Sequence, residues 1–304
     1  MENSPFHVDE LAAQSLAHQS SPGAGIRAFM PDQHRSFFEL LPYLFVATAD
    51  ADGWPAASVL HGEAGFVRSP DPTALRIDAL LAADDPAAAG WRRDRVVGLL
   101  GLDLCNRRRN RANGTLAAVD ERGATVAIAQ SFGNCAQYIQ TRQPAPHRRE
   151  AVAVKRLGGL DAAARHLIGT ADTFFVASRS RASIAQASGL DVSHRGGRPG
   201  FVEMQGDTLS VPDFRGNRFF NTLGNLLGDP RAGLLFIDFA SGDLLQLQGI
   251  VTIDWTDRAA ARIAGAQRSW QIKIERAWRQ PHAFPFDWTF GDYAPTTLAT
   301  GVWA

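Results

Sequence analysis

The chain has 304 residues, 45% of them hydrophobic and 20% charged, and its 31 basic residues are balanced by 31 acidic ones. This length predicts two domains, and the zero net charge argues against nucleic acid or an anionic membrane as a partner. Cys105 and Cys135 are too few for a disulfide framework and have no metal-site spacing, so a cytoplasmic protein without bound metal is expected. Neither a signal peptide nor a run of about 20 apolar residues is present, so no membrane span is expected.

The first half of the chain predicts a helix followed by β structure. Residues 1–34 are expected to form an N-terminal extension. A helix is predicted over 31–41, with Asp32 near its start and Pro42 ending it. The apolar segment 43–48 predicts a strand, and Asp52-Gly53 after it is a hairpin signal.

The second half predicts two more helices and several short strands. Residues 143–147, with two prolines, are interpreted as a linker. Helices are predicted over 161–168 and 217–227. Strands are predicted at 173–178, 209–211, 232–239 and 244–253, with a turn at 241–243. The region 270–288, rich in Trp and Phe, is expected to pack over the barrel.

An internal repeat organises these elements. Gly65-Phe-Val recurs as Gly200-Phe-Val, and Gly98-Leu-Leu recurs at the same offset as Gly233-Leu-Leu. At that offset Asp103 falls on Asp238 and Gly114 on Gly249, and 45–48 resembles 175–178. Many short strands with turns between them argue for a barrel or sandwich. We therefore expect a mainly β protein of two tandem β-barrel copies with a few helices. The expected boundaries are a first copy at 35–145, a linker and helix at 146–168, a second copy at 169–290 and a tail at 291–304.

The segment 209–231 combines polar residues with a strand–loop–helix–strand pattern. Asp213, Arg215, Asn217 and Arg218 fall in the loop, and the helix carries Asn221, Thr222 and Asn225. The N–H groups and partial positive charge at a helix N-terminus suit a phosphate, and arginine adds charge-assisted hydrogen bonds. The alternative is that Asn217 only caps the helix and the arginines are solvated.

Three groups of motifs carry a family resemblance over most of residues 30–255. The first is Pro212-Asp213, Gly216-Asn217-Arg218, Asn225-Leu226 and Asp229-Pro230-Arg231, followed by Gln246-Leu-Gln248-Gly249. The second is Asp191-Val-Ser193-His194-Arg195-Gly before Gly200-Phe-Val, and the third is Asn134-Cys-Ala-Gln-Tyr-Ile. Together they resemble the pyridoxamine 5′-phosphate oxidase-like FMN-binding split-barrel superfamily, and within it a subgroup of predicted flavin-nucleotide-binding proteins.

The resemblance implies two tandem FMN-binding split barrels and a site for FMN. The phosphate would lie near Arg215, Asn217, Arg218 and Thr222, and the strand with Ser193, His194 and Arg195 would run beside the isoalloxazine. Gln246 and Gln248 would face the ribityl chain or ring, and the motif residues Asp213 and Asn225 are included in the implied site. The family often has Lys or Arg where this chain has Asn221-Thr222, and Pro-Lys where it has Ala136-Gln137. These departures weaken a phosphate contact at Asn221-Thr222 and leave the role of Gln137 open.

The first copy lacks the phosphate segment, because the matching stretch 76–91 is rich in Ala and Asp. We therefore expect the second copy to bind FMN, in a pseudo-dimer within one chain, with a homodimer as a further option. The basic run 106–111 has three interpretations: a nucleic-acid or phosphate patch, an exposed hairpin, or a donor of contacts across the copy interface. The last two are favoured, with Arg109, Arg111 and Asn134 as cross-copy contacts.

The leading hypothesis is an FMN-dependent oxidoreductase acting on an unknown small substrate or redox partner. One alternative is a non-catalytic flavin carrier, sensor or partner subunit, and another is a split barrel that binds haem or a deazaflavin. No catalytic residue is assigned, and His7, His18 and His147 are expected to be inert. The absence of Gly-x-Gly-x-x-Gly and Gly-x-Ser-x-Gly motifs argues against a dinucleotide fold and an α/β-hydrolase.

Overall fold

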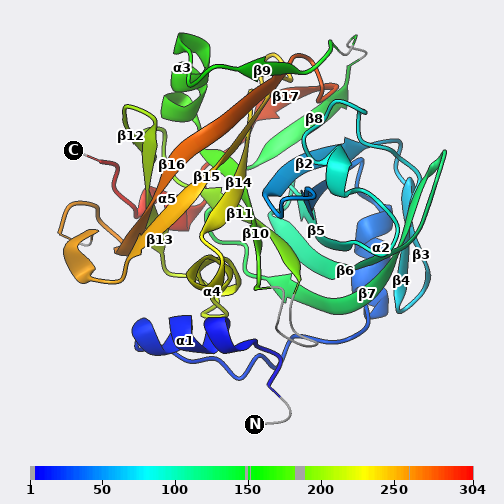
Figure 1. Ribbon diagram of the computed structural model, residues 1–304, viewed down its shortest axis with the longest axis horizontal. Helices are drawn as coiled ribbons and strands as arrows, with labels where there is room; N and C mark the ends of the chain where they lie inside the picture. The colour runs from blue at the N-terminus through cyan, green and yellow to red at the C-terminus, as the bar shows by residue number, and fades with distance from the viewer. Residues whose placement is uncertain (1–3, 148–149, 151, 182–188, 260, 304) are drawn as a thin grey trace.

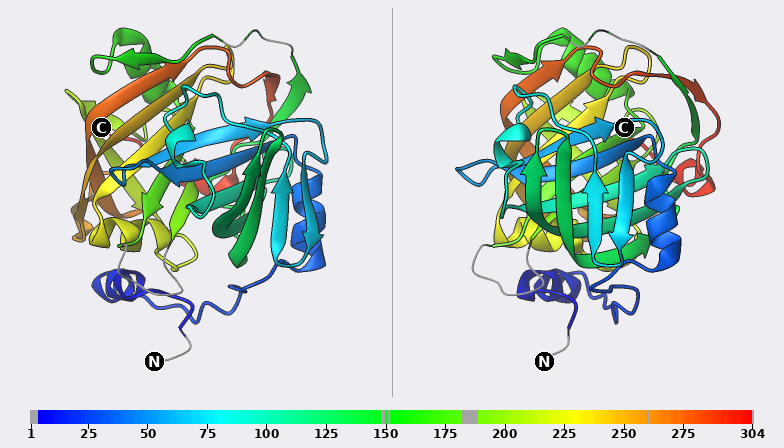
Figure 2. Two further views of the ribbon diagram at one scale, coloured as in Figure 1. Left: turned by 45° about the vertical axis from the view of Figure 1, so that its right-hand side comes forward. Right: turned by 90° about the vertical axis from the view of Figure 1, so that its right-hand side faces the viewer.

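The computed structural model describes residues 4–147, 150, 152–181, 189–259 and 261–303. The architecture is dominated by two large antiparallel sheets, each curled on itself (Figures 1 and 2). The first sheet has the strand order β2-β1-β5-β6-β7-β4-β3. Its strands are β1 Tyr43–Ala49, β2 Pro55–His61, β3 Val67–Asp71, β4 Ala74–Ile77, β5 Val96–Asp103, β6 Arg108–Asp120 and β7 Gly123–Asn134.

The second sheet repeats the topology of the first. Its order is β11-β10-β14-β15-β16-β13-β12, which is the order of the first sheet with each strand replaced by its counterpart. Its strands are β10 Thr173–Arg179, β11 Leu190–Gly196, β12 Glu203–Gln205, β13 Thr208–Phe214, β14 Arg231–Ile237, β15 Leu244–Asp254 and β16 Ala266–Gln280, and β9 Lys155–Leu157 also pairs with β16. The prediction of a mainly β chain with two tandem split barrels is confirmed.

Repeated glycines mark equivalent irregularities in the two barrels. The register of β6 shifts between Asn113 and Gly114, and that of β15 shifts between Gln248 and Gly249. A Cβ on Gly114 would lie 1.9 Å from a backbone oxygen of β7, and one on Gly249 would lie 2.3 Å from a backbone oxygen of β16. A side chain at either position would collide with the neighbouring strand, which explains why both copies carry glycine there.

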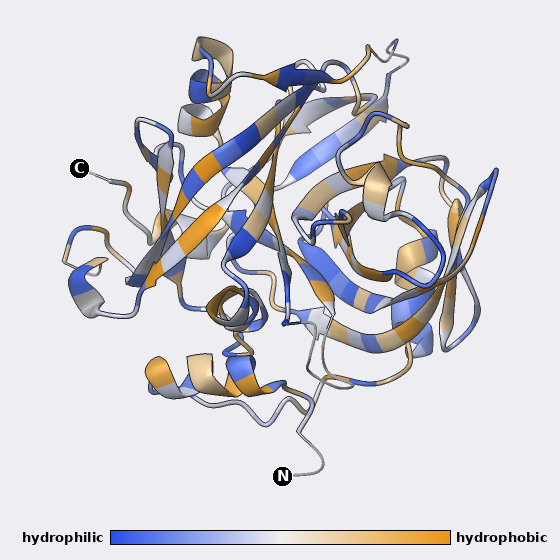
Figure 3. Ribbon diagram, viewed as in Figure 1, coloured by the Kyte–Doolittle hydropathy of each residue, from blue (hydrophilic) through white to orange (hydrophobic). Residues whose placement is uncertain are grey.

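Each barrel has its own apolar core, and a third core joins the two. Alternation of hydrophobic and hydrophilic residues along β16 shows one face turned to the second core (Figure 3). The third core contains β1 and β10, where Phe45 stacks on Phe175 with ring centroids 3.7 Å apart. Because these two phenylalanines occupy equivalent places in the repeat, they lie near the pseudo-twofold axis that relates the barrels.

The barrels approach closely at two symmetry-related glycines. A Cβ on Gly98 of β5 would lie 2.6 Å from the Leu190 oxygen, and a Cβ on Gly233 of β14 would lie 2.5 Å from the Pro55 oxygen. Since backbone atoms cannot move aside as a side chain can, Gly98→Ala and Gly233→Ala should each lower the unfolding free energy by about 1–3 kcal/mol. Gly158→Ala is the matched control, because no atom lies within 4 Å of its Cβ position. Urea unfolding measures all three, and equal stability of the three variants would contradict the close approach.

The predicted helices are present, with one displaced start. They are α2 Asp32–Glu39, α3 Ala162–Thr170 and α4 Asn221–Gly228; α1 Val8–Leu16, α5 Pro295–Leu298 and the short turns Ala88–Gly90 and Asp257–Ala259 complete the helical elements. Helix α4 begins four residues after the predicted start at 217. Arg218 and Phe220 have φ values of 64° and 60°, which a right-handed helix cannot accommodate. No helix among the described residues is long and apolar enough to cross a membrane.

Two interpretations of irregular segments were wrong. The predicted linker at 143–147 is part of strand β8, Arg142–Pro146, which pairs with β17, Phe286–Phe290. A two-stranded ribbon tolerates proline because only one edge of each strand is paired. Trp270 does not pack over the barrel from outside: it lies in β16, a barrel strand, and its side chain is fully buried in the second core.

Candidate functional site

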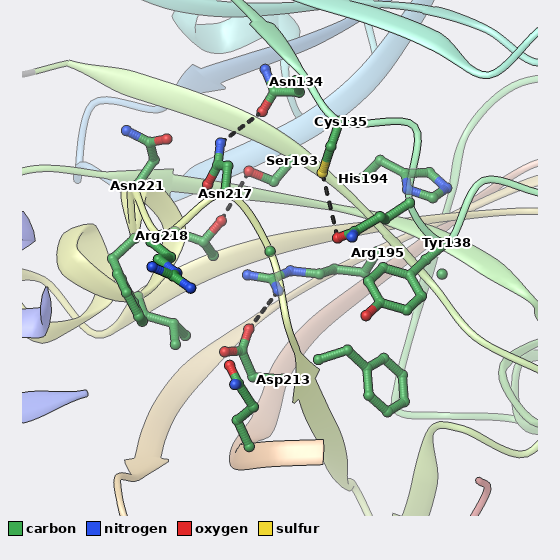
Figure 4. A pocket seen from close by; sticks show the side chains of 18 of the residues that line it. Asn134, Cys135, Tyr138, Ser193, His194, Arg195, Asp213, Asn217, Arg218 and Asn221 are labelled. Atoms are coloured by element: carbon green, nitrogen blue, oxygen red, sulfur yellow. Dashed lines mark hydrogen bonds and ion pairs between the residues drawn. The ribbon is translucent and has the colours of Figure 1, made fainter. Parts of the chain in front are cut away.

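A cavity opens between the two barrels, at the side where the second barrel carries α4 (Figure 4). Its empty volume, which includes the open solvent at its mouth, is about 890 Å³. The second barrel supplies β11, β13, the loop 215–220 and α4. The first barrel supplies β6 and the segment 134–138, and the N-terminal segment supplies Gln19.

The loop 215–220 presents a free cation to the cavity. Arg218 lines the cavity from a left-handed backbone position and has no carboxylate partner among the described residues. No side chain caps the N-terminus of α4. Asn217 is not that cap: its Oδ1 accepts from the Phe219 N–H at 3.1 Å, and its Nδ2 donates to Asn134 Oδ1 at 3.4 Å. An unpaired guanidinium beside an uncapped helix N-terminus is a favourable place for an anion.

Arg111 reaches the site from the other barrel. Its Nε donates to the Val192 oxygen at 3.2 Å and its Nη1 to Asn221 Oδ1 at 2.9 Å, while Nη1 lies 3.6 Å from the Asp191 carboxylate. It also donates to the hydroxyl of Ser193, which in turn accepts from Thr222 Oγ1 at 2.9 Å. This buried arginine therefore joins β11 and α4 of the second barrel to β6 of the first.

Arg109 and His194 form a second polar group in the cavity. Arg109 Nη1 lies 3.3 Å from His194 Nδ1, and Arg109 Nη2 lies 3.7 Å from Cys135 Sγ. Because a guanidinium can only donate, His194 Nδ1 accepts and the imidazole proton is assigned to Nε2. Burial, together with the charges of Arg109 and Arg195, holds the pKa of His194 well below its usual value, and burial lowers the pKa of Arg109 to about 10. At neutral pH the arginine is charged and the histidine is neutral.

Asp213 organises two further arginines. Its carboxylate accepts from Arg195 at 2.7 Å through one oxygen and from Arg268 at 2.7 Å through the other. A carboxylate in this position would repel a phosphate, so Asp213 is not expected to contact one. Its role here is to hold the guanidinium groups of Arg195 and Arg268 in place.

Four residues of the predicted site lie outside the cavity lining. Arg215 is exposed, and its backbone oxygen accepts from the Tyr138 hydroxyl at 3.1 Å. Asn225 is a buried residue of α4, and its Nδ2 donates to Asp191 and Ser178. Gln246 and Gln248 point into the contact with the first barrel, where their Nε2 atoms donate to the Ala57 and Pro55 oxygens, each at 2.9 Å.

The position related to the cavity by the pseudo-twofold axis is occupied by side chains of the chain itself. Gln246 takes the place that Arg111 has in the other half, and Ser58 takes that of Ser193. Asp85 accepts from Ser58 at 2.5 Å and from Gln246 at 3.0 Å, and all three side chains are buried. The 76–91 stretch of the first barrel thus places a buried carboxylate, that of Asp85, at the position where the symmetry-related cavity has arginines.

The N-terminal extension covers α4, which the sequence did not indicate. Helix α1 lies directly under α4 in Figures 1 and 2. His7, expected to be inert, caps α1 and bonds Asn225 Oδ1 through its Nε2 at 2.8 Å. Glu10 is buried and accepts from Asn221 Nδ2 at 2.6 Å. No periodicity or motif links residues 7–10 to 221–225, so only the fold reveals this contact.

Glu10 makes stability depend on pH in a definite direction. Burial, with the nearby Asp191 carboxylate, raises the pKa of Glu10 to about 8. The folded protein therefore binds a proton that the unfolded chain releases near pH 4.5, so this group's contribution to stability falls as pH rises to about 8. Glu10→Gln removes the titration. The melting temperature of the wild type should fall relative to that of Glu10→Gln between about pH 5 and 8, and a constant difference would refute the raised pKa.

Comparison with known proteins supports the architecture. Residues 30–157 match the pyridoxamine 5′-phosphate oxidase family. The matched residues enclose the first sheet, and the second sheet has the same strand order. The first barrel is therefore similar to the pyridoxamine 5′-phosphate oxidase family over the matched residues. The match falls on the first barrel, whereas the motifs quoted above fall mainly on the second.

Several solved structures are similar to part of this chain. HupZ from Group A Streptococcus is 16% identical, with a TM-score of 0.28, covering 37% of this chain and 86% of its own. An FAD-binding protein from Mesorhizobium loti is 11% identical, with a TM-score of 0.29, covering 42% of this chain and 99% of its own. HutZ, a haem storage protein from Vibrio cholerae, is 12% identical, with a TM-score of 0.28, covering 44% of this chain and 97% of its own. No curated protein matches the chain.

Proposed function

We propose that the cavity between the barrels binds FMN and that the protein is a flavoprotein, with FMN-dependent oxidoreduction of a small substrate as its activity. The observation that carries this proposal is the cationic end of the cavity at Arg218. Arg218 has no carboxylate partner among the described residues, and it lies beside the uncapped N-terminus of an eight-residue helix. A phosphate there would receive a charge-assisted hydrogen bond together with the helix N–H groups.

The remaining lining suits the other parts of the cofactor. The hydroxyls of Thr222 on α4 and Ser193 on β11 are hydrogen-bonded to each other, and both residues line the cavity, where ribityl hydroxyls would need polar partners. Arg195 is held at the cavity by Asp213, and its buried Nε has no hydrogen-bond partner in the part of the chain that the structure describes. Bound FMN would supply hydride or electron transfer, while these side chains would position it and set the charge around it.

The histidine tautomer favours flavin over haem as the ligand. A haem iron bound at His194 Nε2 would need the lone pair of that nitrogen and hence a proton on Nδ1. That proton would face the Arg109 guanidinium at 3.3 Å, donor against donor. His194 is therefore better arranged to donate a hydrogen bond than to ligate iron.

The visible spectrum of the purified protein, before and after adding FMN, tests the proposal. We expect flavin absorption bands and saturation at one FMN per chain, because Asp85 occupies the equivalent place in the other half of the pseudo-dimer. A Soret band would indicate haem instead, and a colourless protein that takes up no FMN would refute flavin binding. Two FMN per chain would contradict the role given to Asp85.

Turnover separates the enzyme from a flavin carrier or sensor. For an oxidoreductase we expect NAD(P)H or another donor to bleach the bound flavin and an added acceptor to restore its absorbance. A flavin that binds tightly but is neither reduced nor reoxidised by any donor–acceptor pair would favour the non-catalytic alternative.

A further inference from the structure

We propose that the end of the cavity formed by Arg109 and His194 binds a carboxylate, so that the substrate of this site is a small monoanion held beside the flavin. This inference rests on the proposed function and specifies its substrate class. The two ends of the cavity are well separated: Arg218 and Asn221 lie on one side in Figure 4, and His194, Cys135 and Tyr138 lie on the other. A phosphate at the first end leaves the second end free for another group.

Two buried donors at this end have no hydrogen-bond partner among the described residues. They are Arg109 Nε and His194 Nε2, and both side chains line the cavity. Arg109 forms no ion pair with a carboxylate among the described residues; its contacts are a neutral imidazole and a thiol. Leaving such donors unsatisfied is costly in a buried site, so a ligand group that accepts from both would be favoured.

The charge of the cavity indicates a monoanion. Five arginines line it: Arg109, Arg111, Arg195, Arg218 and Arg268. Asp213 and Asp191 pair with three of them, which leaves a formal excess of three positive charges. A phosphate monoester carries about two negative charges at neutral pH. One positive charge then remains, and the cation without a carboxylate partner at the far end is Arg109.

The shape of the two donors favours a carboxylate over a second phosphate. A guanidinium presents neighbouring N–H groups in a plane that matches a carboxylate. The neutral His194 adds a hydrogen bond without adding charge, so the pair can neutralise one negative charge and not two. Gln137 and Tyr138 lie beside this end and offer neutral hydrogen-bonding groups to the rest of a small substrate.

Benzoate is a suitable probe, because its ring can lie against the flavin while its carboxylate reaches Arg109. The FMN-loaded protein is titrated with benzoate, and the change in flavin absorption is followed; benzamide serves as the neutral counterpart. We expect benzoate to perturb the flavin spectrum with saturation and benzamide to bind roughly tenfold more weakly or worse. In Arg109→Gln, benzoate affinity should fall about tenfold or more, while FMN remains bound.

Matched variants make the test decisive. Arg122→Gln is the control, because Arg122 lies in an exposed turn far from the cavity, and it should bind benzoate as the wild type does. If benzoate leaves the flavin spectrum unchanged, or binds equally to Arg109→Gln, or no better than benzamide, the carboxylate site is wrong although FMN binding stands. If the protein takes up no FMN at all, the proposed function itself has failed.

Discussion

Replacing both Asn217 and Arg218 by alanine should weaken FMN binding by roughly 100-fold, as measured by quenching of flavin fluorescence on titration. The physical reason is the loss of a charge-assisted contact to phosphate, worth about 1.5–3 kcal/mol, together with the Asn217 contacts that hold the loop to Phe219 and Asn134. Arg218 has no ion-pair partner among the described residues. Without FMN, the double variant should therefore melt at nearly the same temperature as the wild type without FMN.

The control for this experiment lies at the matching place of the first barrel. Arg76 pairs there with Asp78 and Asp120 at the surface, so Arg76→Ala should leave FMN affinity unchanged. An equal loss of affinity in both variants would mean that the phosphate is not bound by the second barrel.

Arg111→Met should lower the unfolding free energy by about 3–5 kcal/mol, the usual cost of removing one partner from a buried ion pair. Arg111 bonds to Ser193, Asn221 and the Val192 backbone, and its departure leaves Asp191 buried without its cation. The loss should also loosen the joint between the two barrels, so FMN affinity should fall with stability.

A double-mutant cycle with Asp191→Asn identifies the cause. Removing the carboxylate as well should recover part of the loss, because no unpaired buried charge then remains. Arg122→Met, in an exposed turn, should stay within about 0.5 kcal/mol of the wild type in the same urea titration. If Arg111→Met were no more destabilising than Arg122→Met, the cross-barrel network would not carry the stability assigned to it.

Several features of the fold could be predicted because they depend on local sequence. The strand at 43–48 and its copy at 173–178 follow from short apolar runs bounded by turn residues. Gly114 and Gly249 lie at a bulge that occurs in both barrels. Because both copies need glycine there, the repeat is visible in the sequence. The start of α4 could not be predicted, because its helical periodicity extends into a loop that two positive φ angles exclude from the helix.

The candidate site was predictable in part. Ser193, His194, Arg195, Asn217, Arg218 and Thr222 line one cavity with Arg109, Arg111 and Asn134 of the first barrel. Gln246 and Gln248 alternate with leucines, as residues facing a site would. In the structure, however, both side chains contact the first barrel and do not line the cavity. Alternation along a strand tells which residues share a face and does not tell what that face meets.

The sequence by itself indicated that the chain holds two copies of one barrel, and that the Asn217-Arg218 pair of the second copy has no counterpart in the 76–91 stretch of the first. Hydrophobic periodicity and short motifs involve residues that are close together in the chain, so both can be recognised in the sequence. Arg109 and Arg111 were already expected as contacts between the copies, and both line the cavity. The tertiary structure alone decided that helix α1 closes over α4 through Glu10 and His7. These contacts join residues up to 218 positions apart, and they depend on how the barrels dock about Phe45 and Phe175, which no local pattern encodes.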